Sequence, residues 1–573
     1  MVLGLLLLGR LSASADDPFN NPPGVDIWCG KAYRPEDAAF DPGGWLNAPE
    51  PSRFLLLDLR VFPRMSVYTA DDSEGSFILE ARTSRTRGIP YCSGNIQRHD
   101  VFSVDPVELA FEVSDAETGR TLVTGLEAPA LSISHEVSIS IGDLMPRFAP
   151  YTINVKLILP DCDQIYTTST KIFRLPRRDD GGGVTKIDQL YGGLMVQDYL
   201  SNSTEWKPLF PFSYYVSWGG WLEQDLTQVD AFKAAGYNII HVVPGGGYPP
   251  VNWTTFEQFF DLCDELGLWV MYDLRHTYQN RTLLSDQISR FASRKSLLLW
   301  YTADEPDGHC DPLEAPKTAL GRIRELDPWH PVSLCLNCAN FHYEEYSAGA
   351  DIILSDVYPV AVNTSYSEVY GTVCNTTYGC CGCDNCEGRL SDVSDRLDAF
   401  RRYQDWLGTA PPKSFWGVPQ AFGDEMFWRR NPTPEEEVAM VALSVNHDAK
   451  GIVGWIYPTT DSIAAATRAL ARVVTSEEIT AFLLGSSTQS LEVHSPPAAV
   501  DAAAWVRESK MLVSVVNSGR ATQARVSIIL PEMVVGIAAS KWGDGSGWKA
   551  AGRELSRNGL GKYEVDIVVL DLA

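Results

Sequence analysis

The feature that most constrains this fold is a unit of strand, loop and helix that recurs between residues 205 and 485. Short apolar runs, typical of parallel strands buried on both faces, alternate with segments whose apolar residues recur at helical spacing. Eight such runs occur, at 213–216, 238–243, 268–273, 297–302, 331–336, 351–356, 414–419 and 451–457. Eight parallel strands joined by right-handed helical crossovers close into a (β/α)8 barrel, so we predict that architecture for residues 205–485.

Local signals mark where two helices of this barrel begin. Thr254 and Glu257 have the spacing of a capping box, in which two side chains satisfy the first free N–H groups of a helix. Thr433 stands in the same relation to Glu436, and Pro434 takes the first helical position, where no N–H is needed. We therefore expect one helix capped by Thr254 and another capped by Thr433.

β-rich sequence flanks the barrel on both sides. Residues 25–176 contain alternating and β-rich runs separated by turn residues, which predicts an N-terminal β-sandwich. The charged, glycine-rich segment 177–204 is interpreted as a linker. A last helix is expected over 462–484, and residues 486–573 predict a smaller C-terminal β-sandwich. The predicted fold class is α/β, with a (β/α)8 TIM barrel between two β domains.

The first residues and the sequons indicate a secreted protein. An apolar run ending in small residues predicts a signal peptide over 1–15, truncated or imperfect because Arg10 interrupts it and no basic residues precede it. Five Asn-x-Ser/Thr sequons predict N-linked glycans, at Asn202, Asn252, Asn280, Asn363 and Asn375. No other segment approaches 18 consecutive apolar residues, so we expect no membrane span and an extracellular location.

The 12 cysteines allow two interpretations. The pairs Cys335/Cys338 and Cys383/Cys386 have the C-x-x-C spacing that supplies four thiolates to zinc, which is typical of a zinc-dependent hydrolase as one alternative. In an oxidising compartment the same residues form disulfides, the interpretation that we favour. The loop of the second pair holds further cysteines that a single zinc ion would leave over, namely Cys374, Cys380 and Cys381.

The net charge of -26 limits the classes of molecule that we expect this protein to bind. Such an acidic chain repels phosphate backbones, so we expect no nucleic-acid partner. The glycines at 245–247 lack the lysine or further glycine of a phosphate cradle, and we expect no cofactor and no metal.

Carboxylates and aromatic residues gather where the predicted strands end. In a barrel these carboxyl ends converge on one rim. The candidate residues are Tyr215, His241, Asp273, Arg275, Asp304, Glu305, Asp356, Tyr358, Gln420, Glu425, Trp455 and Tyr457. Aromatic faces stack on sugar rings and carboxylates accept hydrogen bonds from hydroxyl groups, so this set favours a carbohydrate.

One segment of this rim carries a family resemblance. Glu305 follows the fourth strand in the run Trp-Tyr-Thr-Ala-Asp-Glu-Pro and resembles the acid/base segment of clan-A glycoside hydrolases, whose usual form is Asn-Glu-Pro. Trp455 on the eighth strand resembles the aromatic floor of that clan, and the two flanking sandwiches are similar to the layout of family-two-like glycosidases. The resemblance implies a glycosidase with Glu305 as its acid.

The chain departs from that pattern at two positions. Asp304 replaces the asparagine that precedes the acid, and Gln420 stands where the clan places its nucleophilic glutamate. An amide cannot form a glycosyl ester, so the second carboxylate must come from elsewhere, with Asp356, Glu425 and Asp273 as candidates.

We therefore predict Glu305, Asp304 and Asp356 as catalytic residues and the other rim residues as substrate-binding. The predicted function is hydrolysis of an O-glycosidic bond in a poly- or oligosaccharide, with retention or inversion left open. The alternative is a non-catalytic carbohydrate-binding or cell-wall protein, which Gln420 favours.

Overall fold

The computed structural model describes residues 27–33, 43–91, 108–129, 134–158, 164–201, 203–494 and 499–573. The predicted signal peptide over 1–15 and the sequon asparagine Asn202 lie outside the described residues.

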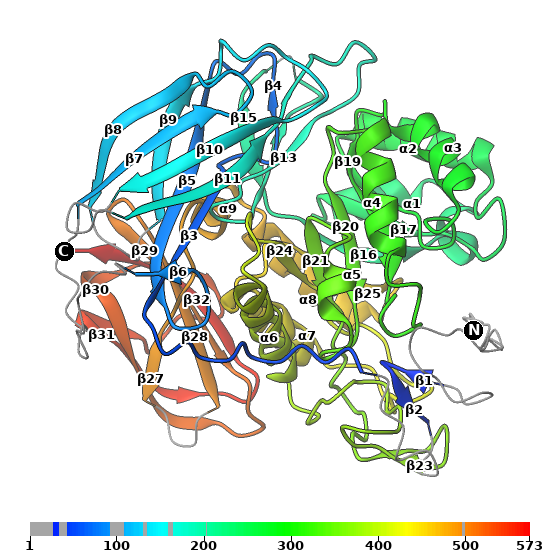
Figure 1. Cartoon of the computed structure of the whole chain (residues 1–573). Coiled ribbons are helices and arrows are strands. Elements are labelled where there is room, and N and C mark those ends of the chain that lie inside the picture. The colour runs from blue at the N-terminus through cyan, green and yellow to red at the C-terminus, as the bar shows by residue number, and fades with distance from the viewer. Residues whose placement is uncertain are drawn as a thin grey trace.

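The centre of the molecule is a closed barrel of eight parallel strands, as predicted (Figure 1). Each strand pairs with the next one in chain order, and the last pairs with the first. The strands are β16 (Phe212–Ser217), β17 (Ile239–Val243), β18 (Trp269–Asp273), β19 (Leu297–Asp304), β20 (Val332–Leu336), β21 (Ile352–Ser355), β24 (Ser414–Gly417) and β25 (Ile452–Tyr457). The α/β fold class is confirmed by this closure.

Helices cover the outside of the barrel. They are α1 (Gln228–Ala234), α2 (Trp253–Leu266), α3 (Arg281–Phe291), α4 (Ala315–Leu326), α5 (Tyr343–Ser347), α6 (Asp392–Leu407), α7 (Pro434–Asn446), α8 (Asp461–Val474) and α9 (Glu477–Gly485). A short π-helix, Trp218–Leu222, precedes α1. Among the described residues, no helix is both long enough and apolar enough to cross a bilayer.

The helix caps confirm one prediction and correct another. Thr433 and Glu436 form the expected capping box at the start of α7. The predicted cap at Thr254 is wrong, because Asn252 has extended backbone and its side chain accepts a hydrogen bond from the Thr254 N–H. Thr254 therefore lies inside the first turn of α2.

The single helix predicted over 462–484 is also wrong, because two helices occupy this segment. α8 ends at Val474, and α9 begins at Glu477 after Ser476 adopts an extended conformation. The hydroxyl groups of Thr475 and Ser476 donate to carbonyls of the preceding turn and so compete with continuation of the helix.

A small antiparallel sheet closes the N-terminal end of the barrel. Its strands are β13 (Thr185–Ile187), β14 (Leu194–Gln197) and β15 (Trp206–Leu209), so the segment interpreted as a linker carries two strands. Ile187 and Leu194 pack in one buried cluster with Trp269 and Trp416 of the barrel. This end is thus filled by apolar side chains, and the opposite end carries the rim residues.

The N-terminal β domain is a sandwich of two four-stranded antiparallel sheets, as predicted. One sheet contains β3 (Leu56–Pro63), β5 (Glu74–Ser84), β6 (Ile89–Pro90) and β9 (Ser134–Ser140), and the other contains β7 (Glu108–Asp115), β8 (Thr121–Pro129), β10 (Tyr151–Ile158) and β11 (Ile165–Ile172). Side chains such as Phe77 and Leu79 interleave with Ile153 and Val155 between the sheets. A two-residue parallel pair, β4 (Tyr68–Thr69) with β12 (Arg174–Leu175), lies beside them.

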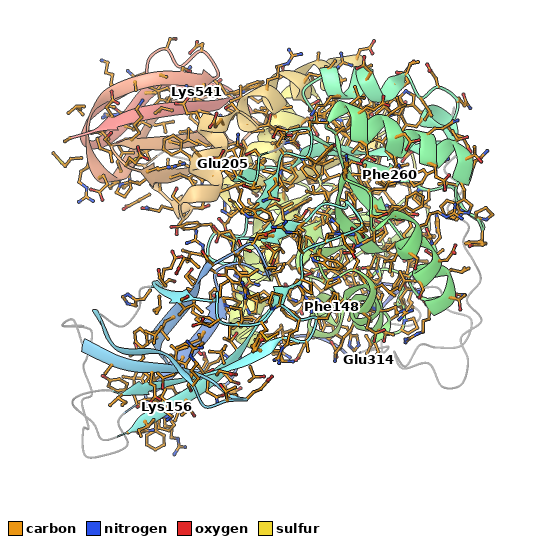
Figure 2. All side chains as sticks on the ribbon, turned by 90° about the horizontal axis from the view of Figure 1, so that it is seen from above. Phe148, Lys156, Glu205, Phe260, Glu314 and Lys541 are labelled. Atoms are coloured by element: carbon orange, nitrogen blue, oxygen red, sulfur yellow. A yellow bond between two sulfur atoms is a disulfide. The ribbon has the colours of Figure 1, made fainter. Side chains whose placement is uncertain are left out.

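The C-terminal β domain is built around the long strand β30 (Gln523–Trp542). The first part of β30 pairs with β31 (Lys549–Leu560) and its second part with β32 (Val565–Leu572), so that the sheet folds over its own apolar core. The other strands are β26 (Gln489–Ser490), β27 (Glu492–His494), β28 (Val500–Arg507) and β29 (Lys510–Asn517). Both β domains lie on the same side of the barrel, as the positions of Lys156 and Lys541 show from above (Figure 2).

The first described residues do not join the N-terminal sandwich. β1 (Ile27–Trp28) and β2 (Lys31–Ala32) form a hairpin that lies beside β23 (Thr372–Val373), whose partner is β22 (Tyr366–Ser367), far from β3 (Figure 1). Ala32 forms a bridge with Tyr378, and a disulfide joins Cys29 to Cys338 across 309 residues of sequence.

Six of the ten described cysteines form disulfides, as we favoured, whereas Cys335 and Cys380 of the predicted set do not. Besides Cys29–Cys338, the described residues contain the pairs Cys374–Cys381 and Cys383–Cys386. The alternative zinc site is wrong, since three of its four thiolates are consumed in disulfides and the fourth, Cys335, is buried in β20. The two C-x-x-C segments therefore cannot bind zinc through four thiolates.

Candidate active site

Glu305 lies immediately after β19, at the carboxyl end of the barrel. Its backbone is left-handed, with φ of 49°, a conformation that residues other than glycine adopt at a cost. The Glu305 N–H donates to the carbonyl of Cys335 in the next strand, which holds this turn against β20. The strained turn directs a half-buried carboxyl group away from the line of β19.

The nearest partners of Glu305 come from the next two strands. The Nδ2 of Asn337, just after β20, donates to Glu305 Oε1 at 2.9 Å and to Oδ1 of Asp356, just after β21, at 3.3 Å. The carboxyl groups of Glu305 and Asp356 are thus bridged by one amide nitrogen. Because the Asn337 amide lies between them, this pair does not flank a sugar carbon as the two acids of a glycosidase do.

Burial and mutual repulsion set the protonation of this pair. Burial raises the pKa of Glu305 well above its usual range, and the adjacent Asp356 raises it further. Burial also raises the pKa of Asp356, to about 6, while its hydrogen bonds to Glu305 and Asn337 oppose that rise. Asp356 therefore ionises first, and its charge keeps the shared proton on Glu305.

Asp304 belongs to a different network, which spans four strands inside the barrel mouth. Its carboxylate accepts hydrogen bonds from Arg275 and Tyr301, each at 2.5 Å. Arg275 also pairs with Asp273, which is fully buried and receives a hydrogen bond of 2.8 Å from His241 Nε2. Asp304, which we predicted as catalytic, thus has both carboxylate oxygens engaged by other residues of the protein.

The residues of the Arg275 network set one another's protonation states. Burial would raise the pKa of Asp273, but Arg275 and His241 outweigh it and lower the pKa to about 2. Burial lowers the pKa of His241, so its ring is neutral at neutral pH and donates through Nε2. Asp273 is therefore a permanent counter-ion of Arg275 and has no free oxygen to act as a nucleophile.

Aromatic rings line the same mouth. Tyr215 stacks against His241, with ring centroids 4.2 Å apart, and its hydroxyl donates to that of Tyr301. The Trp455 ring lies edge-on to Tyr215 at 5.1 Å and, unlike Tyr215, stays partly exposed. Tyr358 packs edge-on against Trp428, whose Nε1 donates to the Tyr358 carbonyl. Trp455 therefore offers the more accessible aromatic face among these predicted binding residues.

Gln420 is not available to a substrate. It is fully buried, its Oε1 accepts from the Val360 N–H, and its Nε2 donates to the carbonyls of Val360 and Phe422. A carboxylate could not make those two donations, which explains physically why an amide occupies this position. Gln420 ties two rim loops together, in place of the substrate-binding role that we predicted.

Two further predicted binding residues take no part in the Arg275 network or the Asn337 bridge described above. Tyr457 packs in the outer layer against Trp221 and Phe232, because the pairing of β16 with β25 shifts register near the strand end. Glu425 is exposed on the loop after β24, in a turn closed by reciprocal backbone bonds with Trp428. Partial burial raises the pKa of Glu425.

The structure adds three residues that the sequence analysis missed. Asn337 bridges the two acids, and its Oδ1 accepts a hydrogen bond of 2.9 Å from Trp28 Nε1. The buried carboxylate of Asp307 accepts from the backbone N–H groups of Cys338 and Gly308, at 2.8 and 2.9 Å, and so fixes the loop that carries Asn337. Burial raises the pKa of Asp307 to about 7. Asp307 could have been found from the segment Glu-Pro-Asp, in which it follows Glu305 by two residues. No sequence pattern indicated the contact between Trp28 and Asn337.

Comparison with known proteins finds similarity to solved structures only, at low sequence identity. No protein-family model and no curated protein matches the chain. Among solved structures, it resembles the β-D-glucuronidase of Dictyoglomus thermophilum (14% identity, 71% of this chain, 64% of that one, TM-score 0.32). It also resembles a GH30 endoxylanase of Clostridium papyrosolvens C71 (10% identity, 63% of this chain, 96% of that one, TM-score 0.39). The chain thus spans less than two thirds of the length of the glucuronidase. The activities in these names are those of the named proteins.

The buried amide of Gln420 yields a stability prediction. Gln420→Glu should destabilise the barrel by about 3 kcal/mol, because two buried carbonyls lose their donor. The expected fall in unfolding temperature is about 5 °C for a barrel of this length, measured by scanning calorimetry. The exposed residue Gln489 supplies the matched control, and Gln489→Glu should leave the temperature unchanged. An unfolding temperature for Gln420→Glu equal to that of the wild type would show that this amide does not tie the loops.

Proposed function

We propose that this protein is a glycoside hydrolase in which Glu305 protonates the leaving oxygen of the scissile bond. The observation that carries the proposal is the Glu305–Asp356 pair at the carboxyl end of the barrel, where burial and a second acid hold a proton on Glu305. General acids need a pKa near or above the working pH, and a carboxyl group reaches it by burial beside a like charge.

The other residues of the site support this one proton donor. Asn337 donates to both acids and so keeps their carboxyl planes in place. Arg275 pairs with both Asp273 and Asp304 and so offsets one of their two negative charges. Trp455 presents a partly exposed aromatic face on which a sugar ring can stack.

The second carboxylate that we propose is Glu425. Asp356 is in contact with Glu305 and Asp273 is held by Arg275, which leaves Glu425 of the three candidates. Its loop follows the seventh barrel strand and is held over the rim by Trp428, whose Nε1 donates to the Tyr358 carbonyl at 2.9 Å. In this scheme Glu425 either attacks the anomeric carbon to form a glycosyl ester, which water then hydrolyses, or takes the proton of a water molecule that attacks this carbon, while Glu305 protonates the leaving oxygen.

A non-catalytic carbohydrate-binding protein is the second candidate. Gln420 favours it, because the seventh strand itself ends in a structural amide and supplies no nucleophile. Oligosaccharide binding by the wild type with no product after long incubation would establish this alternative.

We also propose that the protein is secreted and N-glycosylated. The three described disulfides support passage through an oxidising compartment. Of the four described sequons, three have exposed asparagines, and Asn252 and Asn280 cap α2 and α3 through Oδ1, which leaves Nδ2 for the glycan.

The acid assignment predicts the effect of one substitution. Glu305→Gln should lower kcat for glycoside hydrolysis by about 100- to 10,000-fold, because the amide cannot supply the proton. Binding of the same sugar, measured by calorimetry, should persist. The exposed Glu314 at the start of α4, labelled in Figure 2, gives the control Glu314→Gln with wild-type turnover. Undiminished turnover by Glu305→Gln would end the proposal.

The pairing with Asp356 predicts a change in pH dependence. A general acid is active while protonated, so kcat/KM falls as the pH rises through the pKa of Glu305. Asp356→Asn removes the negative neighbour and lowers that pKa. The alkaline limb of the pH profile should therefore move to lower pH, whereas Asp286→Asn, an exposed change on α3, should leave it in place. An alkaline limb that stays at the same pH, or moves to higher pH, would contradict the proposal that Asp356 holds the proton on Glu305.

Glycosylation is tested by mass. Protein from a eukaryotic secretory host should lose mass on treatment with an N-glycan-releasing amidase, and Asn252→Gln and Asn280→Gln should each reduce that loss. An intact mass equal to that of the bare polypeptide would contradict the proposal.

A further inference from the structure

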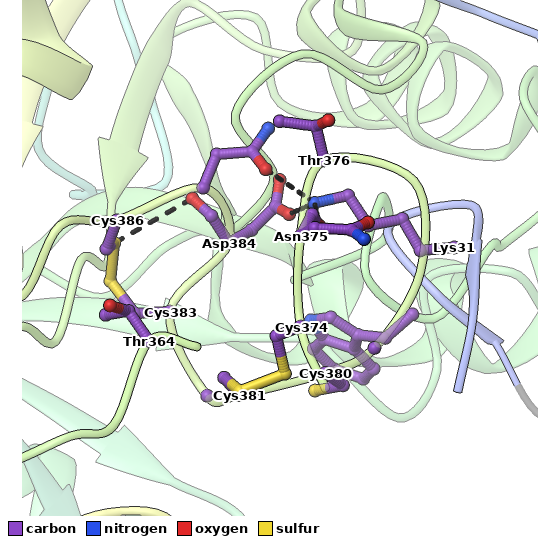
Figure 3. A pocket seen from close by; sticks show the side chains of 14 residues that line it. Lys31, Thr364, Cys374, Asn375, Thr376, Cys380, Cys381, Cys383, Asp384 and Cys386 are labelled. Carbon is purple, nitrogen blue, oxygen red and sulfur yellow. Dashed lines mark hydrogen bonds and ion pairs between the residues drawn. A yellow bond between two sulfur atoms is a disulfide. The ribbon is translucent and has the colours of Figure 1, made fainter. Parts of the chain in front are cut away.

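We propose that a pocket formed by the β1–β2 hairpin and the cysteine loop, residues 374–386, is a second sugar-binding subsite that takes one ring of a neutral oligosaccharide. The inference rests on the proposed function of Glu305 and extends it to the substrate, which would be an oligosaccharide that reaches both places. The pocket has a volume of about 180 Å³ and is lined by Trp28, Lys31, Thr364, Asn375, Cys380 and Asp384 among others (Figure 3).

The side-chain amide of Asn337 links the pocket to Glu305. Trp28, one of its lining residues, donates from Nε1 to Asn337 Oδ1 at 2.9 Å, and Asn337 donates in turn to Glu305 Oε1 at 2.9 Å. Cys380, another lining residue, lies close enough to interact with the charge of Glu305. A chain of sugars with one ring in the pocket therefore places a neighbouring ring beside Glu305.

The walls are rigid before any ligand binds. The Cys374–Cys381 and Cys383–Cys386 disulfides brace the cysteine loop, and Cys29–Cys338 pins the hairpin beside Asn337 (Figure 3). Asp384 also accepts a hydrogen bond of 2.7 Å from the Ala339 N–H. Preorganised walls reduce the entropy that binding must overcome, which suits a subsite for a weakly held sugar.

The charges of the pocket select a neutral ring. The Lys31 ammonium is 4% exposed and donates to Asp384 Oδ1 at 2.5 Å, Asn385 Oδ1 at 2.7 Å and the Asn375 carbonyl at 3.3 Å. An ammonium has three donors, so these contacts use all of them. A sugar carboxylate would find no free cation here and would meet the charge of Asp384, whereas a sugar hydroxyl group can bond to the hydroxyl of Thr364.

Trp28 supplies the apolar surface that a sugar face needs. Its ring is only partly exposed, and its edge contact with His309, at 4.9 Å between centroids, fixes its orientation. An indole held by an edge contact and an Nε1 hydrogen bond presents a fixed face for stacking. The aromatic platform of this subsite thus comes from a hairpin more than 300 residues away in sequence from the loop that completes it.

The test measures binding in a Glu305→Gln background, so that it does not depend on turnover. Cellotriose, xylotriose and mannotriose are titrated by calorimetry, together with the p-nitrophenyl monoglycoside of each sugar. At least one trisaccharide should bind. Thr364→Trp fills the pocket without touching the Asn337 bridge, and Trp28→Ala removes the platform. Each should weaken the trisaccharide by about tenfold, equal to about 1.4 kcal/mol, and leave the monoglycoside unchanged.

Two controls separate stacking from indirect effects. Trp28→Phe keeps an aromatic face but loses the bond to Asn337, and it should retain trisaccharide binding. Thr522→Trp, at an exposed position in the C-terminal domain, should have no effect. The subsite is overturned if no neutral trisaccharide binds, if Thr364→Trp leaves the affinity intact, or if both ligands weaken equally. Trisaccharide binding with these losses in a protein that hydrolyses nothing would refute the proposed reaction and retain the subsite.

Discussion

Closure of the eight-stranded sheet is the constraint on which the rest of this structure depends. Closure satisfies the backbone hydrogen bonds of every barrel strand and forces all eight carboxyl ends onto one rim. Asn337 and Asp356 stand beside Glu305 only because β20 and β21 follow β19 around that ring. The small sheet β13–β15 seals the other end with apolar side chains, so polar chemistry is confined to the rim.

Two kinds of buried charge coexist on this rim and behave differently. Around Arg275, two carboxylates share a cation, and the network remains ionised and inert. Around Glu305, the neighbour is a second carboxyl group, that of Asp356, and Asn337 offers both acids only amide donors. The contrast follows from which partner compensates the charge, and it distinguishes the acids of the Arg275 network from the acid that we propose as the proton donor.

The barrel was predictable because its signal is local and repeated. Every predicted strand overlaps the observed one, since an apolar run bounded by turns is readable at each position. Glu305 and Asp356 were predictable for the same reason, as both directly follow a strand. Gln420 follows a strand and Tyr457 ends one. Hydrogen bonds to loop carbonyls orient Gln420, and a register shift orients Tyr457. Neither effect can be recognised in the sequence. The bond from Trp28 to Asn337 joins residues 309 positions apart, which no periodicity encodes.

The Cys29–Cys338 disulfide has a consequence for how the molecule is made. At a synthesis rate of about 5–20 residues per second, the 309 residues between these cysteines take roughly 15 to 60 s to emerge. During that interval the hairpin has neither its thiol partner nor the loop on which it rests. The N-terminal sandwich can fold meanwhile, since its core includes no residue of the hairpin. The wall beside Glu305 consequently cannot be completed until Cys338 has been translated and the two thiols have been oxidised.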